Sequence, residues 1–441
     1  MDKTIIDNYF VLINKLRGTL RPESIVKILV FSLYLKCSER NKDLLDEKFS
    51  LAYLSLTYGV VIQASDIMTY IEKHEQWYNL EKGLLSGELS QLLDGVETEK
   101  VRSIFSAVNS VECDYCALAY ALIDYMSANS GKDAGEAYTN PSISCLIERI
   151  ADCKEGASIY DGYCGYGTLI NTVANNKGIV YMQDINRSAL AIATLLTIMK
   201  GTTIGVIRCG DTNLNPLDIS KKYDVVVLDP TYNVKKYDPT YLESAFSTFN
   251  LPEIGVYESS YLPVRHAVAS LNDEGMALVI CPMGMLFSSG KTAAVREIVI
   301  NNYLDTVIEL PNGMCDNTVI PLAIMVLRKN KRDNGVFMIN AKSFTEKNGR
   351  SRVSFTEEGI NSISKMVREK EIVKGISNYV LIEELAKYEY NLCTTRYVAE
   401  NIANVIQTED VHVYIQRYSE LSEVVTELDN SLKRLRERFV K

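Results

Sequence analysis

Histidine and tryptophan are scarce in this chain of 441 residues, which holds three histidines and one tryptophan. The ten cysteines show no repeated spacing, and the single C-x-x-C pair, Cys113 and Cys116, has no second pair to match it. A structural zinc site needs about four Cys or His ligands at a recognisable spacing, so the sequence predicts no metal site. His74, His266 and His412 form no pattern with a nucleophile, and we assign them no role.

Long apolar runs are also missing. No run reaches the roughly 20 residues that span a bilayer, and no signal peptide is recognised. Scattered free thiols are typical of a reducing compartment, so we expect a cytoplasmic protein that does not enter a membrane. The net charge of -9 argues against binding nucleic acid by bulk attraction alone. A nucleic-acid substrate would therefore require a basic partner to supply many of the phosphate contacts.

Residues 1–130 show the apolar spacing of helices, as in Val101, Ile104, Phe105 and Val108. We expect an N-terminal helical domain there. The sequence of this domain indicates no chemistry, and docking of a partner or plain structural packing are equally open. The small, polar segment 127–135 predicts a hinge.

Predicted strands and helices alternate from residue 131 to residue 345, which is typical of a parallel sheet covered by helices. The expected strands are 158–161, 179–183, 203–208, 223–228, 276–281, 306–310 and 320–328. A further strand is expected at 336–341, followed by a polar loop at 347–352. Residues 131–345 are therefore the predicted catalytic domain, and residues 346–441 are a C-terminal region.

The end of the chain carries a heptad pattern that predicts a coiled-coil helix. Its apolar positions are Tyr418, Leu421, Val425, Leu428, Leu432, Leu435 and Phe439. Such a stripe needs a second stripe to cover it. A helix of a partner subunit and packing on the same chain are both open at this stage.

The strand 223–228 is a short, buried-type apolar run that ends abruptly in Asp229-Pro230-Thr231-Tyr232. The carboxyl ends of strands in an open α/β sheet are where ligands bind. A carboxylate, a proline carbonyl and an aromatic ring at one point suit a flat ring that carries an amino group. The plainer alternative is a strand end with an N-capping aspartate.

Three earlier strand ends predict a nucleoside site. Asp161 opens a glycine-rich turn that reaches Gly167, where the backbone can approach a ligand closely. Asp184 ends the next strand, where a carboxylate accepts hydrogen bonds from ribose hydroxyls, and Asp211 follows the third strand, near the expected adenine. The turn has no lysine or arginine to meet a pyrophosphate, and no G-K-[ST] motif is present. A nucleoside without phosphates fits, and S-adenosylmethionine is the obvious one.

Ordered motifs then resemble the modification (methylase) subunits of type I restriction–modification systems, in the N6-adenine DNA methyltransferase family. Segment 135–141 is similar to the family's G-[EQ]-[FY]-[FY]-T-P signature. Segment 161–167 resembles its D-P-x-C-G-S-G loop, and segment 229–232 corresponds to its N-P-P-[FY] motif. Further resemblance lies in segments 277–291, 307–312, 320–321 and 390–398.

The resemblance implies a class I S-adenosylmethionine-dependent methyltransferase, with a Rossmann-like sheet of six parallel strands and an antiparallel seventh. It implies N6 methylation of an adenine flipped out of DNA, with S-adenosyl-L-methionine as cofactor. The catalytic motif falls on Asp229, Pro230, Thr231 and Tyr232. The cofactor-binding positions fall on Tyr138, Thr139, Asp161, Cys164, Gly165, Gly167, Thr168, Asp184, Ile185 and Asp211.

The resemblance further implies a hetero-oligomer with two methylase copies, a specificity subunit that selects the DNA sequence, and a restriction (nuclease/translocase) subunit as an additional partner. The chain departs from the family pattern at Asp229 (usually Asn), Thr231 (usually Pro), Tyr166 (usually small) and Asn140 (absent between Thr and Pro). These departures leave a catalytically weak or inactive scaffold that binds a partner and DNA as an alternative. Methylation of protein glutamine or of RNA is a third reading, disfavoured by the segments after residue 270.

Overall fold

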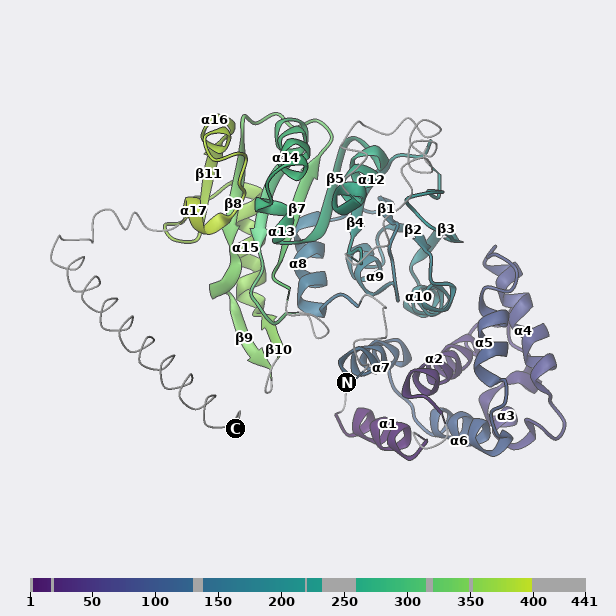
Figure 1. The fold of residues 1–441 in the computed structure, drawn as a ribbon. Coiled ribbons are helices and arrows are strands. Elements are labelled where there is room, and N and C mark those ends of the chain that lie inside the picture. Colours follow the sequence, from purple (N-terminus) through teal and green to yellow (C-terminus); the bar gives the residue numbers. More distant parts are fainter. Residues whose placement is uncertain are drawn as a thin grey trace, which may run out of the picture.

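The computed structural model describes residues 3–16, 20–129, 138–218, 220–231, 259–314, 320–348 and 352–398. Its first part is helical and lies beside one end of a sheet (Figure 1). These elements are α1 (Lys3–Leu16), α2 (Pro22–Ser38), η1 (Glu47–Phe49), α3 (Leu51–Thr57), α4 (Ala64–Trp77), α5 (Leu85–Leu93), α6 (Thr98–Asn109) and α7 (Tyr115–Asn129). Within the described ranges, no helix combines the length and the apolar character that crossing a bilayer requires.

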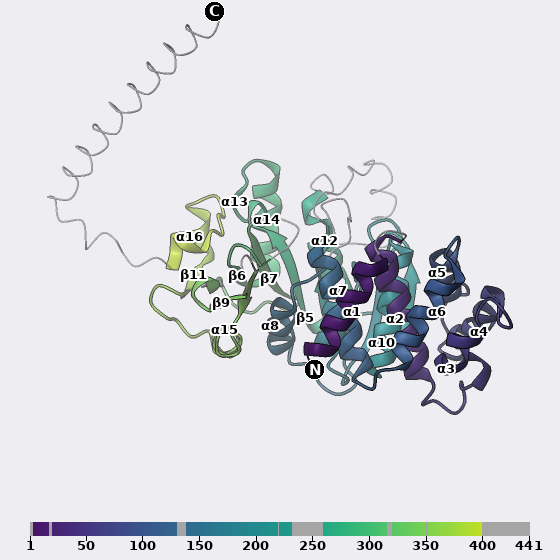
Figure 2. The ribbon, with the colours of Figure 1, turned by 90° about the horizontal axis from the view of Figure 1, so that it is seen from below.

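Helix α2 forms the centre of this helical part. Pro22 occupies its first turn, where the missing N–H costs nothing, and every residue from Ile25 to Tyr34 is buried. A helix that is buried on all sides packs against several neighbours. Helix α2 contacts α5, α6 and α7, and it also contacts α10 (Arg187–Lys200) of the sheet part. It therefore connects the helical part to the sheet (Figure 2).

One sheet organises the rest of the chain. Its strands, in the spatial order β11-β8-β6-β7-β5-β4-β1-β2-β3, are β1 (Ser158–Asp161), β2 (Ile179–Asp184), β3 (Thr203–Cys209), β4 (Tyr223–Leu228), β5 (Leu271–Pro282), β6 (Leu304–Glu309), β7 (Leu322–Arg328), β8 (Gly335–Asn340) and β11 (Ser377–Leu381). Strands β1 to β5 pair in parallel, whereas β7 is antiparallel to both β5 and β6. The predicted seven-strand arrangement with an antiparallel seventh strand is therefore confirmed, and β8 and β11 extend it at one edge.

Helices cover both faces of this sheet. The central strand β4 shows why: Val225 and Val227 belong to one buried cluster, and Val226 and Leu228 belong to the other. A strand buried on both faces reads as a continuous apolar run. The covering elements are α8 (Pro141–Ala151), α9 (Thr168–Ala174), α10, η3 (Ser259–Tyr261), α12 (Leu262–Ser270), α13 (Gly284–Phe287), α14 (Lys291–Asn302), η4 (Ala341–Ser343), α15 (Glu357–Glu369), α16 (Ile382–Ala386) and α17 (Thr394–Val398).

The prediction of a polar loop at 347–352 is wrong at both ends of that range, where the structure has strands. Strands β9 (Thr345–Asn348) and β10 (Arg352–Phe355) pair antiparallel, and residues 349–351 lie outside the described ranges. Val353 and Phe355 alternate with polar neighbours and pack against the core, which is the period of a half-buried strand. The charged composition of the segment hid this two-residue period. The predicted start of the fifth strand is also wrong: β5 begins at Leu271, before the expected residue 276.

A buried arginine anchors the segment that follows α16. Arg296 of α14 is 1% exposed. Its guanidinium donates hydrogen bonds to the carbonyl oxygens of Tyr390 (2.7 Å), Glu389 (3.1 Å), Met285 (3.1 Å) and Ser288 (2.9 Å). These acceptors come from two chain segments about a hundred residues apart, so one side chain holds them together. The segment 390–398, which carries part of the family resemblance, is fixed to the sheet in this way.

The variant Arg296→Met should lower the free energy of unfolding by about 2–4 kcal/mol, because the buried guanidinium and its four hydrogen bonds to carbonyl oxygens are lost. Chemical denaturation measures this change. Arg332→Met is the matched control, since Arg332 is 80% exposed and pairs with a similarly exposed Glu274. Equal stability of the two variants would show that the carbonyl cluster does not depend on Arg296.

Candidate functional site

Four aspartates lie at or just beyond the carboxyl ends of β1 to β4, on one edge of the sheet. Asp161 ends β1, Asp184 ends β2, Asp211 follows β3 and Asp229 follows β4. Strand β1 lies between β4 and β2. Strands β2 and β3 follow on one side of β1, and β4 and β5 follow on its other side, so the strand order reverses at β1. Such a switch point is where open α/β sheets bind ligands. Strands β1 and β4 are neighbours (Figure 1), so Asp161 at the end of β1 and Asp229 just after β4 belong to adjacent strand ends.

Asp229 is held by a residue from a distant part of the chain. The hydroxyl of Thr139 donates a 2.6 Å hydrogen bond to Oδ2 of Asp229, and Thr139 is itself buried. Burial of Asp229 raises the pKa of its carboxyl to about 6, and the bond from Thr139 acts in the opposite direction. Pro230 is buried and Thr231 is exposed, whereas Tyr232 lies outside the described residues. The carboxylate of Asp229 is therefore partly shielded from water and held in orientation by Thr139 at the end of β4.

The glycine-rich turn after β1 is fastened at two carboxylates. Oδ1 of Asp161 accepts a hydrogen bond from the backbone N–H of Tyr163 at 2.9 Å. The N–H of Gly165, which has a φ of +52°, donates to Oδ2 of Asp184 at 2.8 Å. Burial raises the pKa of Asp161 well above its usual range, the bond from Tyr163 lowers it, and the nearby charges of Asp184 and Asp229 raise it further. The turn and the end of β2 therefore form one hydrogen-bonded unit.

The same turn lies very close to helix α10. Gly167 has a φ of +73°, and a Cβ atom there would lie 2.8 Å from the Cβ of Ala193. Glycine is therefore required both by the backbone conformation and by the packing distance. Cys164 is buried, and its backbone N–H donates to the carbonyl of Gln183 at 3.1 Å. Thr168 is buried and begins α9 directly after the turn.

The end of β2 offers polar and apolar surface side by side. Oδ1 of Asp184 accepts from the N–H of Asn186 at 2.8 Å. Burial raises the pKa of Asp184, while backbone N–H groups of Asn186, Gly165 and Ile185 lower it. Ile185 is 69% exposed although its side chain is apolar. Each carboxylate oxygen of Asp184 still has a lone pair for a further donor.

These residues fit a nucleoside such as S-adenosyl-L-methionine. A carboxylate can accept from the two ribose hydroxyls, and the exposed aliphatic side chain of Ile185 offers a face for a ring. Tyr138 is partly buried directly before Thr139, and Asp211 accepts from the N–H of Asn213 at 2.9 Å. The predicted residues lie just before α8, at the ends of β1 and β2, or in the segments that follow β1 to β4: Tyr138, Thr139, Asp161, Cys164, Gly165, Gly167, Thr168, Asp184, Ile185, Asp211, Asp229, Pro230 and Thr231.

Two residues, Tyr163 and Asn140, make contacts that were not expected from the sequence. Tyr163 donates its hydroxyl to Oδ1 of Asn213 at 2.6 Å, which ties the glycine-rich turn to the segment after β3. Asn140 caps α8 by accepting from the N–H of Ser142 at 2.9 Å. Its amide nitrogen donates to the carbonyl oxygens of Met314 (2.7 Å) and Val353 (3.4 Å). Asn140 therefore joins three segments, and its position before a proline was the one available sign of a helix cap.

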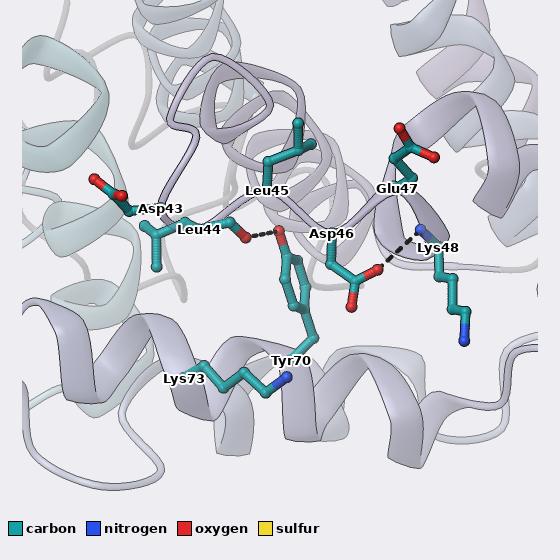
Figure 3. Close-up of a pocket in the computed structure, with 8 residues that line it drawn as sticks. All are labelled: Asp43, Leu44, Leu45, Asp46, Glu47, Lys48, Tyr70 and Lys73. Carbon is teal, nitrogen blue, oxygen red and sulfur yellow. Dashed lines mark hydrogen bonds between the residues drawn. The ribbon is translucent and has the colours of Figure 1, made fainter.

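A cavity of about 470 Å³ lies elsewhere, beside α4 and η1 (Figure 3). Its lining residues are Asp43, Leu44, Leu45, Asp46, Glu47, Lys48, Tyr70 and Lys73. The hydroxyl of Tyr70 donates a hydrogen bond to the carbonyl of Leu44 at 2.8 Å. The backbone N–H of Lys48 donates to one carboxylate oxygen of Asp46 at 3.1 Å. The cavity contains none of the predicted site residues.

The sequence matches known proteins over most of its length. The model of the family described as N-6 DNA Methylase matches residues 114–404. The chain is 26% identical over 340 residues to the methylase subunit of the type I restriction enzyme MpnII of Mycoplasma pneumoniae, covering 69% of this chain and 62% of that protein. It is also 26% identical to the MjaVII methylase subunit of Methanocaldococcus jannaschii, covering 68% and 56% respectively. The chain thus spans about three fifths of the length of these curated relatives.

The fold also resembles a solved structure. The type I restriction-modification system methyltransferase subunit from Streptococcus thermophilus superposes with a TM-score of 0.68 at 20% identity. The match covers 90% of this chain and 98% of that one. At this identity the likeness concerns the fold.

The variant Gly167→Ala should lower the free energy of unfolding by about 3 kcal/mol, because strain at positive φ adds to a clash with Ala193. Gly201→Ala is the matched control: Gly201 has a φ of +74°, but a Cβ atom added there would meet no atom within 4 Å. It should cost only about 1 kcal/mol. Urea denaturation of both variants measures the difference, and equal losses would contradict the close packing of the turn on α10.

Proposed function

Because the chain belongs to the N-6 DNA Methylase family, we propose that it is the methylase subunit of a type I restriction–modification system. In this proposal the exocyclic N6 of an adenine in DNA takes the methyl group of S-adenosyl-L-methionine, S-adenosyl-L-homocysteine leaves, and the nitrogen releases one proton to solvent. The observation that carries the proposal is the position of Asp229. Its carboxylate follows the buried strand β4 and accepts a hydrogen bond from Thr139. Strand β4 pairs with β1, and the glycine-rich turn follows β1.

The exocyclic nitrogen of adenine is a poor nucleophile, because its lone pair is delocalised into the ring. The carboxylate of Asp229 and the carbonyl of Pro230 are acceptors that can draw its hydrogens out of the ring plane. They also stabilise the positive charge that develops on nitrogen as the new bond forms. The hydrogen bond from Thr139 orients one carboxylate oxygen and leaves the other for the substrate. By the family resemblance, Tyr232 holds the flipped base by stacking, a contact worth about 1–3 kcal/mol.

The cofactor would be held by residues of this chain along the same edge. Asp184 would accept hydrogen bonds from the ribose hydroxyls, Ile185 would support one face of the adenine, and Asp211 would meet its amino group. Gly165 and Gly167 let the backbone of the turn approach the ligand. When bound, S-adenosyl-L-methionine supplies the electrophilic methyl group. Alignment of the substrate nitrogen with that group accounts for much of the rate.

DNA binding would depend on other subunits. The chain has a net charge of -9, so its own surface is poorly suited to attract a polyanion. We propose a specificity subunit that selects the sequence, two methylase copies in the assembly, and a restriction subunit as a further partner. The heptad segment 418–439, which lies outside the described residues, is the proposed helix for a partner subunit. The domain borders at residues 130 and 345 belong to the same proposal.

A second candidate is a scaffold that keeps the fold without methyl transfer. It is favoured by Thr231, which replaces the second proline of the family motif and is exposed beside the site. A threonine at this position adds a backbone N–H and removes the rigidity of proline. The scaffold reading requires that no DNA adenine is methylated with any partner, whereas the catalytic reading requires transfer that depends on Asp229.

The wild-type chain, co-expressed with a neighbouring specificity subunit, should transfer labelled methyl groups from S-adenosyl-L-methionine to N6 of adenine in DNA. Asp229→Ala should reduce the rate at least about a hundredfold, because it removes an acceptor aimed at developing charge. Asp218→Ala, which changes an exposed aspartate, is the matched control and should leave the rate unchanged. No incorporation with any partner would support the scaffold instead.

The rate should also depend on the protonation of Asp229. With its pKa raised to about 6, the carboxyl loses its negative charge as the pH falls through that value, and it becomes a weaker acceptor that also carries an O–H donor. The ratio kcat/KM should therefore fall below about pH 6 in the wild type. In Asp229→Asn the amide oxygen stays an acceptor at every pH, so this limb should disappear. A limb of the same midpoint in both proteins would assign the titration to another group.

A further inference from the structure

A buried lysine of the helical part reaches the sheet part beside the glycine-rich turn. Lys27 of α2 has a side chain that is 5% exposed. Its Nζ donates to Oε1 of Glu23 at 2.5 Å and to Oγ of Ser188 at 2.8 Å. Ser188 lies in the first turn of α10 and donates its hydroxyl to Glu88 of α5 at 2.5 Å. Two helices of the helical part therefore meet the start of α10 through one chain of hydrogen bonds.

The same lysine lies over a ring of the turn itself. Nζ of Lys27 is 5.8 Å from the ring centroid of Tyr166. Tyr166 is 2% exposed, so the contact between cation and ring is shielded from water. Tyr166 lies between Gly165 and Gly167 and occupies the position at which the family usually carries a small residue. The large ring thus gives the turn a contact with α2 that a small side chain could not reach.

A second bridge lies one residue earlier on α10. Arg187 donates to Oε1 of Glu81 at 2.8 Å and to the carbonyl of Lys82 at 3.4 Å. The turn that carries Glu81 and Lys82 is itself held by Glu75, which is 1% exposed. The carboxylate of Glu75 accepts from three backbone N–H groups, those of residues 83, 85 and 86, at 2.7–2.8 Å. The segment that meets Arg187 is therefore held in place by three hydrogen bonds to a buried carboxylate.

The contacts of Lys27 and Arg187 meet the proposed cofactor site at two places, the glycine-rich turn and the start of α10. Tyr166 belongs to the turn whose Gly165 N–H binds Asp184, and Arg187 and Ser188 follow Asp184 by three and four residues. We propose that Lys27 is a positioning residue for cofactor binding, which holds the glycine-rich turn and the start of α10 in register. In this arrangement helices α2 and α5 form an outer support of the cofactor site. The inference rests on the proposed function, because it requires S-adenosyl-L-methionine as the ligand.

The test is calorimetric titration of the full chain with S-adenosyl-L-methionine, comparing the wild type with Lys27→Met. The variant nearly keeps the length of the side chain and removes its charge. It should weaken binding by about tenfold, because a buried charged donor and its contact with the ring are lost together. Lys27→Arg, which keeps the charge, should recover most of the affinity. In the transfer assay, Lys27→Met should raise KM for the cofactor while kcat stays near the wild-type value.

Lys36→Met is the matched control. Lys36 also lies on α2, but it pairs with Glu39 at 2.7 Å and Asn109 at 3.1 Å, both in the helical part. It should leave the affinity for the cofactor unchanged even if it lowers the melting temperature. If Lys27→Met does not fold, Ser188→Ala removes the central hydroxyl without creating a charge, and it should weaken binding by about threefold.

The outcomes separate the two proposals. Absence of cofactor binding by the wild type would overturn the proposed function. Wild-type binding together with equal affinity in a folded Lys27→Met or Ser188→Ala variant would overturn the positioning role alone. A drop in melting temperature without a change in affinity would show that the lysine serves stability only, and this result also overturns the inference.

Discussion

The hydrogen bond between Thr139 and Asp229 joins two segments that are 90 residues apart in the sequence. Thr139 lies just before α8, the first helix of the sheet part, and Asp229 directly follows the central strand β4. Because β4 is buried on both faces, the carboxyl at its end is withdrawn from water, and its pKa rises. The hydroxyl of Thr139 compensates part of this cost and fixes the orientation of the carboxylate. An acceptor in a fixed position is what transfer to an amino nitrogen requires.

Other polar residues of the proposed site also stabilise the protein backbone around it. Asp184 holds the turn through the N–H of Gly165 and its own following turn through the N–H of Asn186. Asn140, an apparent departure from the family motif, caps α8 and binds carbonyls of Met314 and Val353. Residues that would contact a ligand are therefore held by bonds that exist without one, which is the preorganisation that binding sites rely on.

Several of these features could be read from the sequence. Strand β4 could be predicted, because a short β-branched run that stops at Pro230 is typical of a buried strand. The aspartates could be placed at one edge, because parallel strands present their carboxyl ends together. The hydrogen bond from Thr139, the contact of Lys27 with Tyr166 and the carbonyl cluster around Arg296 could not be predicted. Each joins segments far apart in the chain, and a local period carries no information about such pairs. The hairpin of β9 and β10 was missed because its charged residues outweighed its alternation.

The contacts between α2 and the glycine-rich turn also work in the reverse direction. Binding free energies at two coupled sites are reciprocal, so if Lys27 and Ser188 strengthen the hold on a nucleoside, the nucleoside strengthens the hold of α2 and α5 on the sheet by the same factor. In the proposed function, the bound cofactor would therefore also stabilise the contact between the helical part and the sheet. The helical part, which carries none of the predicted site residues, would in this way respond to whether the site holds its ligand.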